Sequence, residues 1–272
     1  MNIPTVKLNN NLTIPQIGLG LWQVTNQEDF NKAFKSAYDE GYRMFDTAQF
    51  YRNEQYLGLA IQKYKINRSD LFITTKIAVN NFGFKKTIKS FKESLAKLNT
   101  DYIDLILLHF PVSVLRKKSY LALEEIYSKK EALSIGVSNY TIRHLEDLFK
   151  YAQIVPVINQ VELHVFLQQP ELIIYCKEHQ IAVEAYSPLA HGLKMENDII
   201  TKLALKYHKT YAQIMLRFLV QLDLIVIPKS ITPKRIKENF NIFDFKIDES
   251  DMDELKSLNK NLRTCWNPTL VP

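Results

Sequence analysis

The segment YRMFDTAQFYRNEQYLGLAIQKY, residues 42–64, joins two hydrophobic patterns within one short stretch. Its first part, YRMFDT, is a short apolar run typical of a buried strand, and its last part, NEQYLGLAIQKY, has apolar residues at helical spacing. Asp46 lies near the end of the first part, and Tyr51 lies in the short stretch between the two parts. The segment therefore predicts a strand that leads through a polar loop into a helix.

The same strand-and-helix pair repeats along the chain. It first occurs as QIGLG (16–20) followed by a helical pattern over residues 26–41, which Asn26 would cap and Gly41 would end. Successive strand ends are separated by roughly 30 residues, and this interval is the length of one βαβ unit. Eight such units are the number that a (β/α)₈ barrel, or TIM barrel, contains. The later pairs are residues 71–76 with 85–98, 103–109 with 119–129, 132–139 with 141–152, 157–162 with 169–179, 181–187 with 197–221, and 224–228 with 232–240.

A doubly wound open sheet is the competing fold, because it also alternates strands with helices. Its nucleotide-binding form needs G-x-G-x-x-G after the first strand, whereas GLGLWQ (18–23) has Gln23 at the third glycine position. The barrel is therefore favoured. No linker-like or low-complexity stretch divides the chain, so residues 1–272 are expected to form one domain.

Three segments lie outside the repeated pairs. VKLNNNLTIPQI (6–17) has two short alternating runs around an Asn-rich turn, which predicts an N-terminal β-hairpin that could cover the bottom of the barrel. DESDMDELKSL (248–258) predicts a surface helix with Ser250 as its N-cap. The C-terminal tail after this helix is expected to lie over the barrel mouth.

Composition and charge exclude several classes of protein. The longest apolar runs, such as IDLILL (103–108), are far shorter than the roughly 18 residues of a membrane helix. The N-terminus lacks the features of a secretion signal, so a cytosolic protein without a membrane partner is expected. The net charge of +6 is spread along the chain, which predicts no nucleic-acid partner. Cys176 and Cys265 form no metal or disulfide motif, so no metal is expected and both are interpreted as small buried hydrophobic residues.

Four polar residues fall where barrel enzymes place their chemistry, at the carboxyl ends of strands. Asp46, Lys76 and His109 end three successive predicted strands, and Tyr51 follows the first of them. Each has an ordinary structural explanation when taken singly: a turn cap, a lysine that reaches solvent, and a hydrogen-bonded core histidine. Together they form one chemically coherent set.

Seven motifs in register resemble the successive motifs of the aldo-keto reductase superfamily, and they span essentially the whole chain. This resemblance implies a (β/α)₈ barrel that reduces an aldehyde or ketone to an alcohol by hydride transfer from NADPH. The motifs are FDTAQFYRNEQYLG (45–58), ITTK (73–76), LILLHFP (105–111), IGVSNY (135–140), NQVELH (159–164), YSPL (186–189) and IPKS with the R and EN that follow it (227–239).

The four residues also suit that chemistry on physical grounds. Hydride addition to a carbonyl leaves an alkoxide, so the site must supply a proton and stabilise negative charge. Tyr51 is the expected proton donor, and Lys76 is expected to lower its pKa, which is ordinarily about 10. Asp46 would hold Lys76 and compensate its charge, while His109 would orient the substrate oxygen. The resemblance implies the same roles.

The resemblance also implies how the nicotinamide end of NADPH is bound. Ser138, Asn139 and Gln160 would hydrogen-bond the carboxamide, and the ring of Tyr186 would stack on the nicotinamide. The neighbouring residues Ser187 and Leu189 are included in the predicted cofactor site.

An anion site is predicted near the end of the repeated pairs. Thr232 and Pro233 are suited to the N-cap and first position of a helix, whose amino end attracts anions. Basic and polar residues stand beside this helix end, and the resemblance implies that the adenosine 2′-phosphate binds here, with two further residues near the adenine. The phosphate residues are Lys229, Ser230 and Arg235, and the adenine residues are Glu238 and Asn239.

The substrate contacts are expected to be mostly aromatic, in addition to His109. Phe110 stands where many relatives have Trp, and Ala190-His191 follow YSPL where a Gly is common, so both departures concern substrate preference. Glu162 and His164 fit the family motif and are interpreted as structural. The aromatic residues of the predicted substrate wall are Trp22, Phe50, Phe110 and Trp266.

Two other functions use similar barrels. One is a regulatory or sensing protein that keeps the cofactor but has little turnover. The other is a lyase or isomerase that acts on phosphorylated substrates and uses a lysine as a Schiff base. The four polar residues favour a reductase over the sensor, and the cofactor motifs favour it over the lyase. The chain is expected to act as a monomer on a small carbonyl compound, whose identity the residues leave open.

Overall fold

The computed structural model describes residues 3–193 and 197–272. Its main sheet has eight parallel strands in the order of the chain, from β3 to β10. Parallel bridges between Ile17 and Val226 and between Gly20 and Lys229 join the first strand to the last, so the sheet closes into a barrel. This closure confirms the barrel and excludes the open sheet. The strands are β3 (Leu19–Gly20), β4 (Met44–Asp46), β5 (Phe72–Ile77), β6 (Leu105–Leu108), β7 (Ile135–Ser138), β8 (Ile158–Glu162), β9 (Ala182–Tyr186) and β10 (Ile225–Val226).

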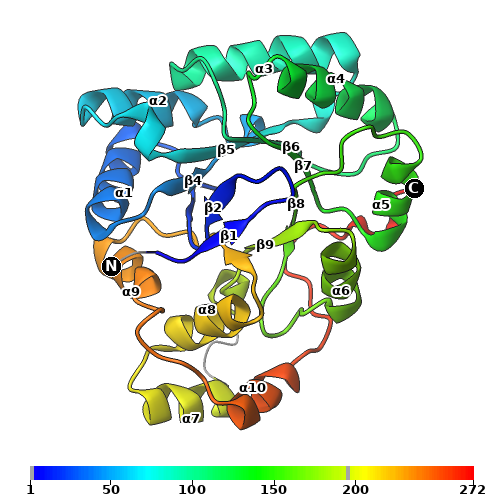
Figure 1. The fold of residues 1–272 in the computed structure, drawn as a ribbon. Helices are drawn as coiled ribbons and strands as arrows, with labels where there is room; N and C mark the ends of the chain where they lie inside the picture. The colour runs from blue at the N-terminus through cyan, green and yellow to red at the C-terminus, as the bar shows by residue number, and fades with distance from the viewer. Residues whose placement is uncertain (1–2, 194–196) are drawn as a thin grey trace.

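Helices surround the sheet, as Figure 1 shows. The expected caps of the first helix are present: the Asn26 side chain accepts a hydrogen bond from the Asp29 N–H, and Gly41 ends the helix with φ of 111°. A positive φ of this kind suits glycine, which has no Cβ. The helices are α1 (Gln27–Glu40), α2 (Glu54–Lys63), α3 (Phe84–Leu98), α4 (Arg116–Ser128), α5 (Ile142–Phe149), α6 (Pro170–Glu178), α7 (Asp198–Tyr207), α8 (Tyr211–Gln221), α9 (Pro233–Phe240) and α10 (Glu249–Lys256).

The N-terminal hairpin covers the amino end of the barrel, as predicted. Strands β1 (Thr5–Lys7) and β2 (Thr13–Pro15) pair antiparallel. In the turn between them, the Asn10 side chain donates to the Leu133 carbonyl and the Ser134 hydroxyl, directly before β7. Ile14 is buried in an apolar cluster with residues of β4, β6, β8 and β10. The hairpin and this cluster fill one end of the barrel, so the polar strand ends lie at the other.

The last helix begins earlier than the sequence suggested. Asp248 is the N-cap of α10, and the Met252 N–H already donates to the Asp248 carbonyl at 2.9 Å. The prediction of Ser250 as N-cap was therefore wrong. Asp251, in the first turn of the helix, is buried and accepts hydrogen bonds from Lys206 and Tyr207 of α7, which fixes the start of α10 against its neighbour.

Among the described helices, none is both long and apolar enough to cross a membrane.

Gly58 on α2 packs directly against the end of α3, and this contact provides a test of the helix packing. A Cβ at this position would stand 2.6 Å from the Lys97 carbonyl oxygen and 2.9 Å from the Leu98 carbonyl carbon, both of them backbone atoms. We expect Gly58→Ala to lower the free energy of unfolding by about 1–3 kcal/mol, despite the higher helix propensity of alanine. Urea unfolding measures this, with Leu59→Ala on the exposed face of α2 as control. A more stable Gly58→Ala would contradict this packing.

Candidate active site

A cavity of about 980 Å³ opens at the carboxyl ends of the strands. Almost every residue that the sequence predicted for catalysis, cofactor or substrate lines this cavity, although Lys76 does not and lies beneath it. Tertiary structure thus brings together side chains from seven strand ends, from α9 and from the C-terminal tail. The predicted residues that line it are Trp22, Asp46, Phe50, Tyr51, His109, Phe110, Ser138, Asn139, Gln160, Tyr186, Ser187, Leu189, Lys229, Ser230, Arg235, Glu238, Asn239 and Trp266.

A buried ion pair lies at the base of the cavity. Lys76 and Asp46 have side chains that are 0% and 2% exposed, and Lys76 Nζ donates to Asp46 Oδ1 at 2.5 Å. The same ammonium donates to the Thr47 carbonyl at 3.0 Å and to the Tyr51 hydroxyl oxygen at 3.3 Å. An ammonium has three N–H groups, so all of them are used. The Lys76 charge is therefore paired and fixed in direction toward Tyr51.

The state of Tyr51 differs from the prediction. The sequence argument expected Lys76 to lower the pKa of Tyr51, but burial, Asp46 and Glu184 together raise the pKa of this hydroxyl well above its ordinary value. The reason is that Asp46 neutralises the lysine charge while burial disfavours a phenolate. Tyr51 is thus protonated near neutral pH, which is the form that a proton donor needs.

His109 stands beside Tyr51, with ring centroids 5.6 Å apart. Burial, together with the nearby charge of Lys76, lowers the pKa of His109 to about 3. The imidazole is therefore neutral near neutral pH and can donate one hydrogen bond without carrying a charge. Of these two residues, Tyr51 is the one with a proton to give up.

A buried glutamate that the sequence reasoning missed completes the polar cluster. Gln160 Nε2 donates to Asp46 Oδ2 at 2.8 Å and to Glu184 Oε1 at 3.3 Å, which links the two carboxyl groups. Burial, then Asp46, raises the pKa of Glu184 to about 8, so this carboxyl keeps its proton while Asp46 pairs with Lys76. The sequence did contain an indication that Glu184 belongs to the site. It is the one charged residue within the otherwise apolar strand β9, and it lies two residues before Tyr186, so the two side chains share one face of the strand.

The residues expected at the nicotinamide end hold one another in place. The Tyr186 hydroxyl donates to Asn139 Oδ1 at 2.7 Å, and Asn139 Nδ2 donates to the His109 carbonyl at 3.1 Å. The Ser138 hydroxyl donates to the Gln160 carbonyl at 2.9 Å. Among the described residues no hydrogen bond reaches Gln160 Oε1, so an acceptor remains for an amide N–H. The ring of Tyr186 is thus fixed at the cavity wall.

Another part of the cavity is basic. Lys229 and Arg235 are exposed there, and neither forms an ion pair within the described chain. Thr232 is the N-cap of α9 and Pro233 follows it, as predicted, but the Thr232 side chain makes no capping bond; instead the Thr232 N–H donates to Ser230 Oγ at 3.1 Å. Two unpaired cations beside an uncapped helix start suit an anion.

The aromatic residues predicted for the substrate form one continuous wall. Trp22 stacks on Phe50 with ring centroids 5.6 Å apart. Trp266, from the C-terminal tail, meets the edge of Phe50 at 5.7 Å and of Phe110 at 6.1 Å. The tail therefore lies over the barrel mouth, as expected, and its tryptophan joins rings that follow three different strands.

The interpretation of both cysteines as buried hydrophobic residues was right for one of them. Cys176 is buried in α6, whereas Cys265 is half-buried and lines the cavity. Cys265 Sγ lies 3.1 Å from His191 Nε2 and 3.5 Å from Ser187 Oγ. The sequence argument connected His191 only with substrate preference, and its contact with Cys265 was not expected, because only the folded tail brings these groups together. No cluster of three potential metal ligands occurs among the described residues.

The fold and the cavity define a barrel with a buried tyrosine hydroxyl and two exposed cations at the carboxyl ends of its parallel strands. Comparison with known proteins places it more narrowly: residues 16–260 match the model of the Aldo/keto reductase family, and the chain belongs to this family of oxidoreductases. It is 42% identical over 264 residues to glyoxal reductase of Bacillus subtilis (strain 168), a match that covers 97% of this chain and 96% of that protein.

Two solved structures show the same fold. One is MGS-M4, an aldo-keto reductase enzyme from a Medee basin deep-sea metagenome library, with a TM-score of 0.94 and 42% identity over 99% of this chain and 100% of that one. The other is the aldo-keto reductase AKR2E4 of Bombyx mori in complex with NADP, with a TM-score of 0.90 and 32% identity over 97% and 95% of the two chains.

The raised pKa of Glu184 predicts a specific dependence of stability on pH. Between about pH 4.5 and about pH 8 the unfolded state loses this proton while the folded state keeps it, so the stabilising contribution of the group is lost as pH rises through that window. Glu184→Gln does not titrate. Its free energy of unfolding relative to wild type should therefore rise with pH, by at most about 1.4 kcal/mol per pH unit.

Urea unfolding at intervals from about pH 5 to about pH 8 measures this difference. Glu178→Gln, on the exposed surface of α6, controls for the general loss of a negative charge. A difference between wild type and the Glu184→Gln variant that stays constant across the window would contradict a protonated Glu184.

Proposed function

We propose that this protein is an NADPH-dependent reductase that converts a small aldehyde or ketone to the alcohol, with Tyr51 as proton donor. The observation that carries the proposal is the position of the Tyr51 hydroxyl, which lies 3.3 Å from the paired ammonium of Lys76 in a cavity that extends to Lys229 and Arg235. Glyoxal is our first candidate substrate, because the glyoxal reductase of Bacillus subtilis is a relative over nearly the whole chain.

The groups around Tyr51 suit a proton transfer to a substrate oxygen. A bound nicotinamide cofactor supplies the hydride in this chemistry. Neutral His109 donates a hydrogen bond that orients the substrate oxygen toward Tyr51, whose O–H then gives its proton to the alkoxide. Lys76 stabilises the phenolate that remains, since its ammonium already points at the Tyr51 oxygen. Asp46 keeps Lys76 in place, so the cluster begins the reaction without net charge.

The chain also has groups that fit each end of NADPH. Gln160 Oε1 and the Asn139 and Ser138 side chains suit the carboxamide, and the ring of Tyr186, held by Asn139, suits stacking on the nicotinamide. At the other end, Lys229 and Arg235 are cations without a carboxylate partner in the described chain, which suits the 2′-phosphate. Other cavity residues, in smaller roles, are Ser187, Leu189, Ser230, Glu238 and Asn239.

The alternative functions receive less support. A Schiff-base lyase needs a lysine that is free to attack a carbonyl, but Lys76 is buried with all three N–H groups engaged. A sensor with little turnover needs no proton donor, yet Tyr51 and His109 both face the cavity. The single-domain organisation, monomeric state and cytosolic location stay predictions from the sequence.

Tyr51→Phe tests the proton donor. The ring and its packing remain while the hydroxyl is lost, so we expect kcat for glyoxal to fall at least about 100-fold with little change in NADPH affinity. Turnover is followed by the loss of NADPH absorbance, and cofactor binding by quenching of protein fluorescence. Near wild-type turnover in the mutant would remove Tyr51 from the mechanism.

Arg235→Ala and Lys229→Ala test which cofactor the basic end recognises. Hydrogen bonds to charged groups contribute on the order of 1.5–3 kcal/mol, so either change should weaken NADPH binding by very roughly 10- to 150-fold and leave NADH nearly unaffected. Arg235→Ala should be at least as damaging, because a guanidinium can bind a phosphate with two parallel hydrogen bonds. Both side chains are exposed, so added salt should reduce the difference.

Dissociation constants for both cofactors, in wild type and each mutant, measure this effect. The matched control is Lys234→Ala, which removes an exposed charge from the same helix turn but does not line the cavity. Equal wild-type affinities for NADPH and NADH, or mutants that weaken both alike, would show that this helix start does not recognise the 2′-phosphate.

A further inference from the structure

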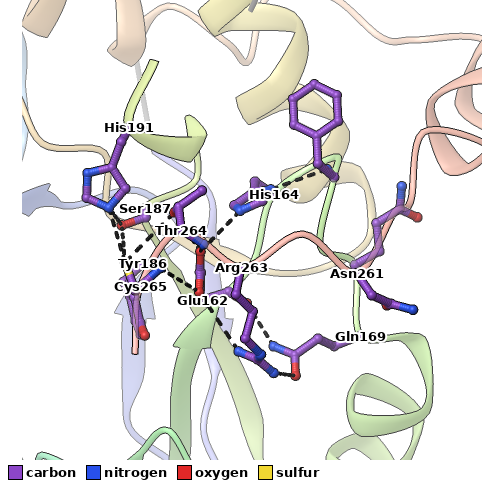
Figure 2. Close-up of polar contacts among 12 residues, drawn as sticks. Glu162, His164, Gln169, Tyr186, Ser187, His191, Asn261, Arg263, Thr264 and Cys265 are labelled. Carbon is purple, nitrogen blue, oxygen red and sulfur yellow. Dashed lines mark hydrogen bonds and ion pairs between the residues drawn. The ribbon is translucent and has the colours of Figure 1, made fainter. Parts of the chain in front are cut away.

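Glu162, the last residue of β8, is a fully buried glutamate that faces the C-terminal tail, residues 257–272. Its Oε1 accepts hydrogen bonds from the N–H and the hydroxyl of Thr264, both at 2.6 Å. Its Oε2 accepts from the Cys265 N–H at 3.3 Å and lies 3.9 Å from Arg263 Nη1. Figure 2 shows these contacts converging on one carboxylate. Both of its oxygens therefore hold a segment that lies 102 residues later in the chain.

The surroundings of Glu162 keep it charged and fixed. Burial alone would raise its pKa, but hydrogen bonds from His164 and Thr264 outweigh burial and lower the pKa of Glu162 below its ordinary value. His164 Nδ1 accepts from the Phe166 N–H at 3.3 Å, so a neutral imidazole has its proton on Nε2, which faces Glu162 Oε1 at 3.3 Å. Glu162 is thus an ionised acceptor whose position β8 and the following loop determine.

The tail is held on both sides of one cavity residue. Before it, Glu162 binds residues 263–265, and the Phe166 carbonyl accepts from the N–H groups of Lys260 and Leu262. After it, His144 Nε2 lies 2.8 Å from the Val271 carbonyl oxygen. Between these attachments stands Trp266, which is 66% exposed and whose ring meets Phe50 and Phe110 of the aromatic wall. The place of this ring depends on where the backbone of residue 265 is held.

We propose that Glu162 is a positioning residue for substrate selection: by holding the backbone of Thr264 and Cys265, it sets Trp266 against Phe50 and Phe110 and so shapes the substrate side of the cavity. This inference rests on the proposed reductase function. Within the described chain, Glu162 forms no hydrogen bond or ion pair with Asp46, Tyr51 or Lys76. Its effect should therefore fall on substrate binding and spare the chemical step.

Kinetics with two substrates separate these effects. We expect Glu162→Ala to raise KM for 4-nitrobenzaldehyde about 3- to 10-fold, which is the contribution of one aromatic contact to binding. This substrate is large enough to reach Trp266. KM for glyoxal, kcat for both substrates and the NADPH dissociation constant should each change less than about 3-fold. Glu171→Ala on α6 is the matched control and should change nothing, because it removes an exposed glutamate that forms no hydrogen bond or ion pair with the tail within the described residues.

A double-mutant cycle tests whether Glu162 acts through the tryptophan. If it does, Glu162→Ala should have almost no further effect on KM for 4-nitrobenzaldehyde in a Trp266→Ala background, because the contact is already absent. Additive effects of the two changes would overturn the proposal. Should Glu162→Ala fail to fold, Thr264→Val removes only one hydrogen bond from the same carboxylate and should shift KM in the same direction by a smaller factor.

A readout that needs no activity keeps the inference separate from the proposed function. The chain has two tryptophans, so Trp22→Phe leaves Trp266 as the only one. In that background, Glu162→Ala should lower the fluorescence anisotropy of Trp266 by adding nanosecond motion, while Glu171→Ala should not. Unchanged anisotropy would overturn the proposal. Two outcomes together would overturn the reductase function and leave the tail contact supported: the wild-type protein reduces no carbonyl at all, and Glu162→Ala still lowers the anisotropy of Trp266.

Discussion

The buried ion pair between Lys76 and Asp46 is the constraint on which the rest of the site depends. A charge enclosed in a barrel is tolerated only when it is paired and its hydrogen bonds are satisfied, and here the carboxylate, a backbone carbonyl and the Tyr51 oxygen satisfy all three N–H groups of the ammonium. This arrangement places one hydroxyl at the base of an open cavity. It also contributes to the protonation of Glu184: burial raises the pKa of this carboxyl, and the nearby charge of Asp46, which already pairs with Lys76, raises it further.

The two ends of the barrel show how the fold makes room for this cluster. At the amino end, the hairpin and an apolar cluster fill the interior, so stability comes from burial of hydrophobic surface. At the carboxyl end, strand ends, α9 and the tail leave an open cavity lined by both a basic region and an aromatic wall. The wall takes rings from segments that are distant in sequence, and one of these rings, Trp266, comes from the C-terminal tail.

Several features could be predicted because they depend on local pattern. Strands and helices follow from hydrophobic spacing, and the ends of parallel strands must meet at one edge, so Asp46, Lys76 and His109 could be expected to converge before any geometry was known. Other expectations failed where a third group intervened. The pKa of Tyr51 is raised, because Asp46 cancels the charge of Lys76 while burial adds its own cost. Ser250 is not the N-cap of α10, because the helix already begins after Asp248 and Asp251 is held by Lys206 and Tyr207 of α7.

By itself the sequence determined the eight strand-and-helix units and the residue types at each strand end, because these depend on spacing along the chain, and it favoured a barrel over an open sheet. Tertiary structure alone decided which atoms of those residues meet: the Gln160 amide between two carboxyl groups, and the Glu162 carboxylate on Thr264 and Cys265. The physical reason is that burial, hydrogen bonding and charge act over a few ångströms in space. Contacts between residues a hundred positions apart therefore leave no periodic signal in the chain.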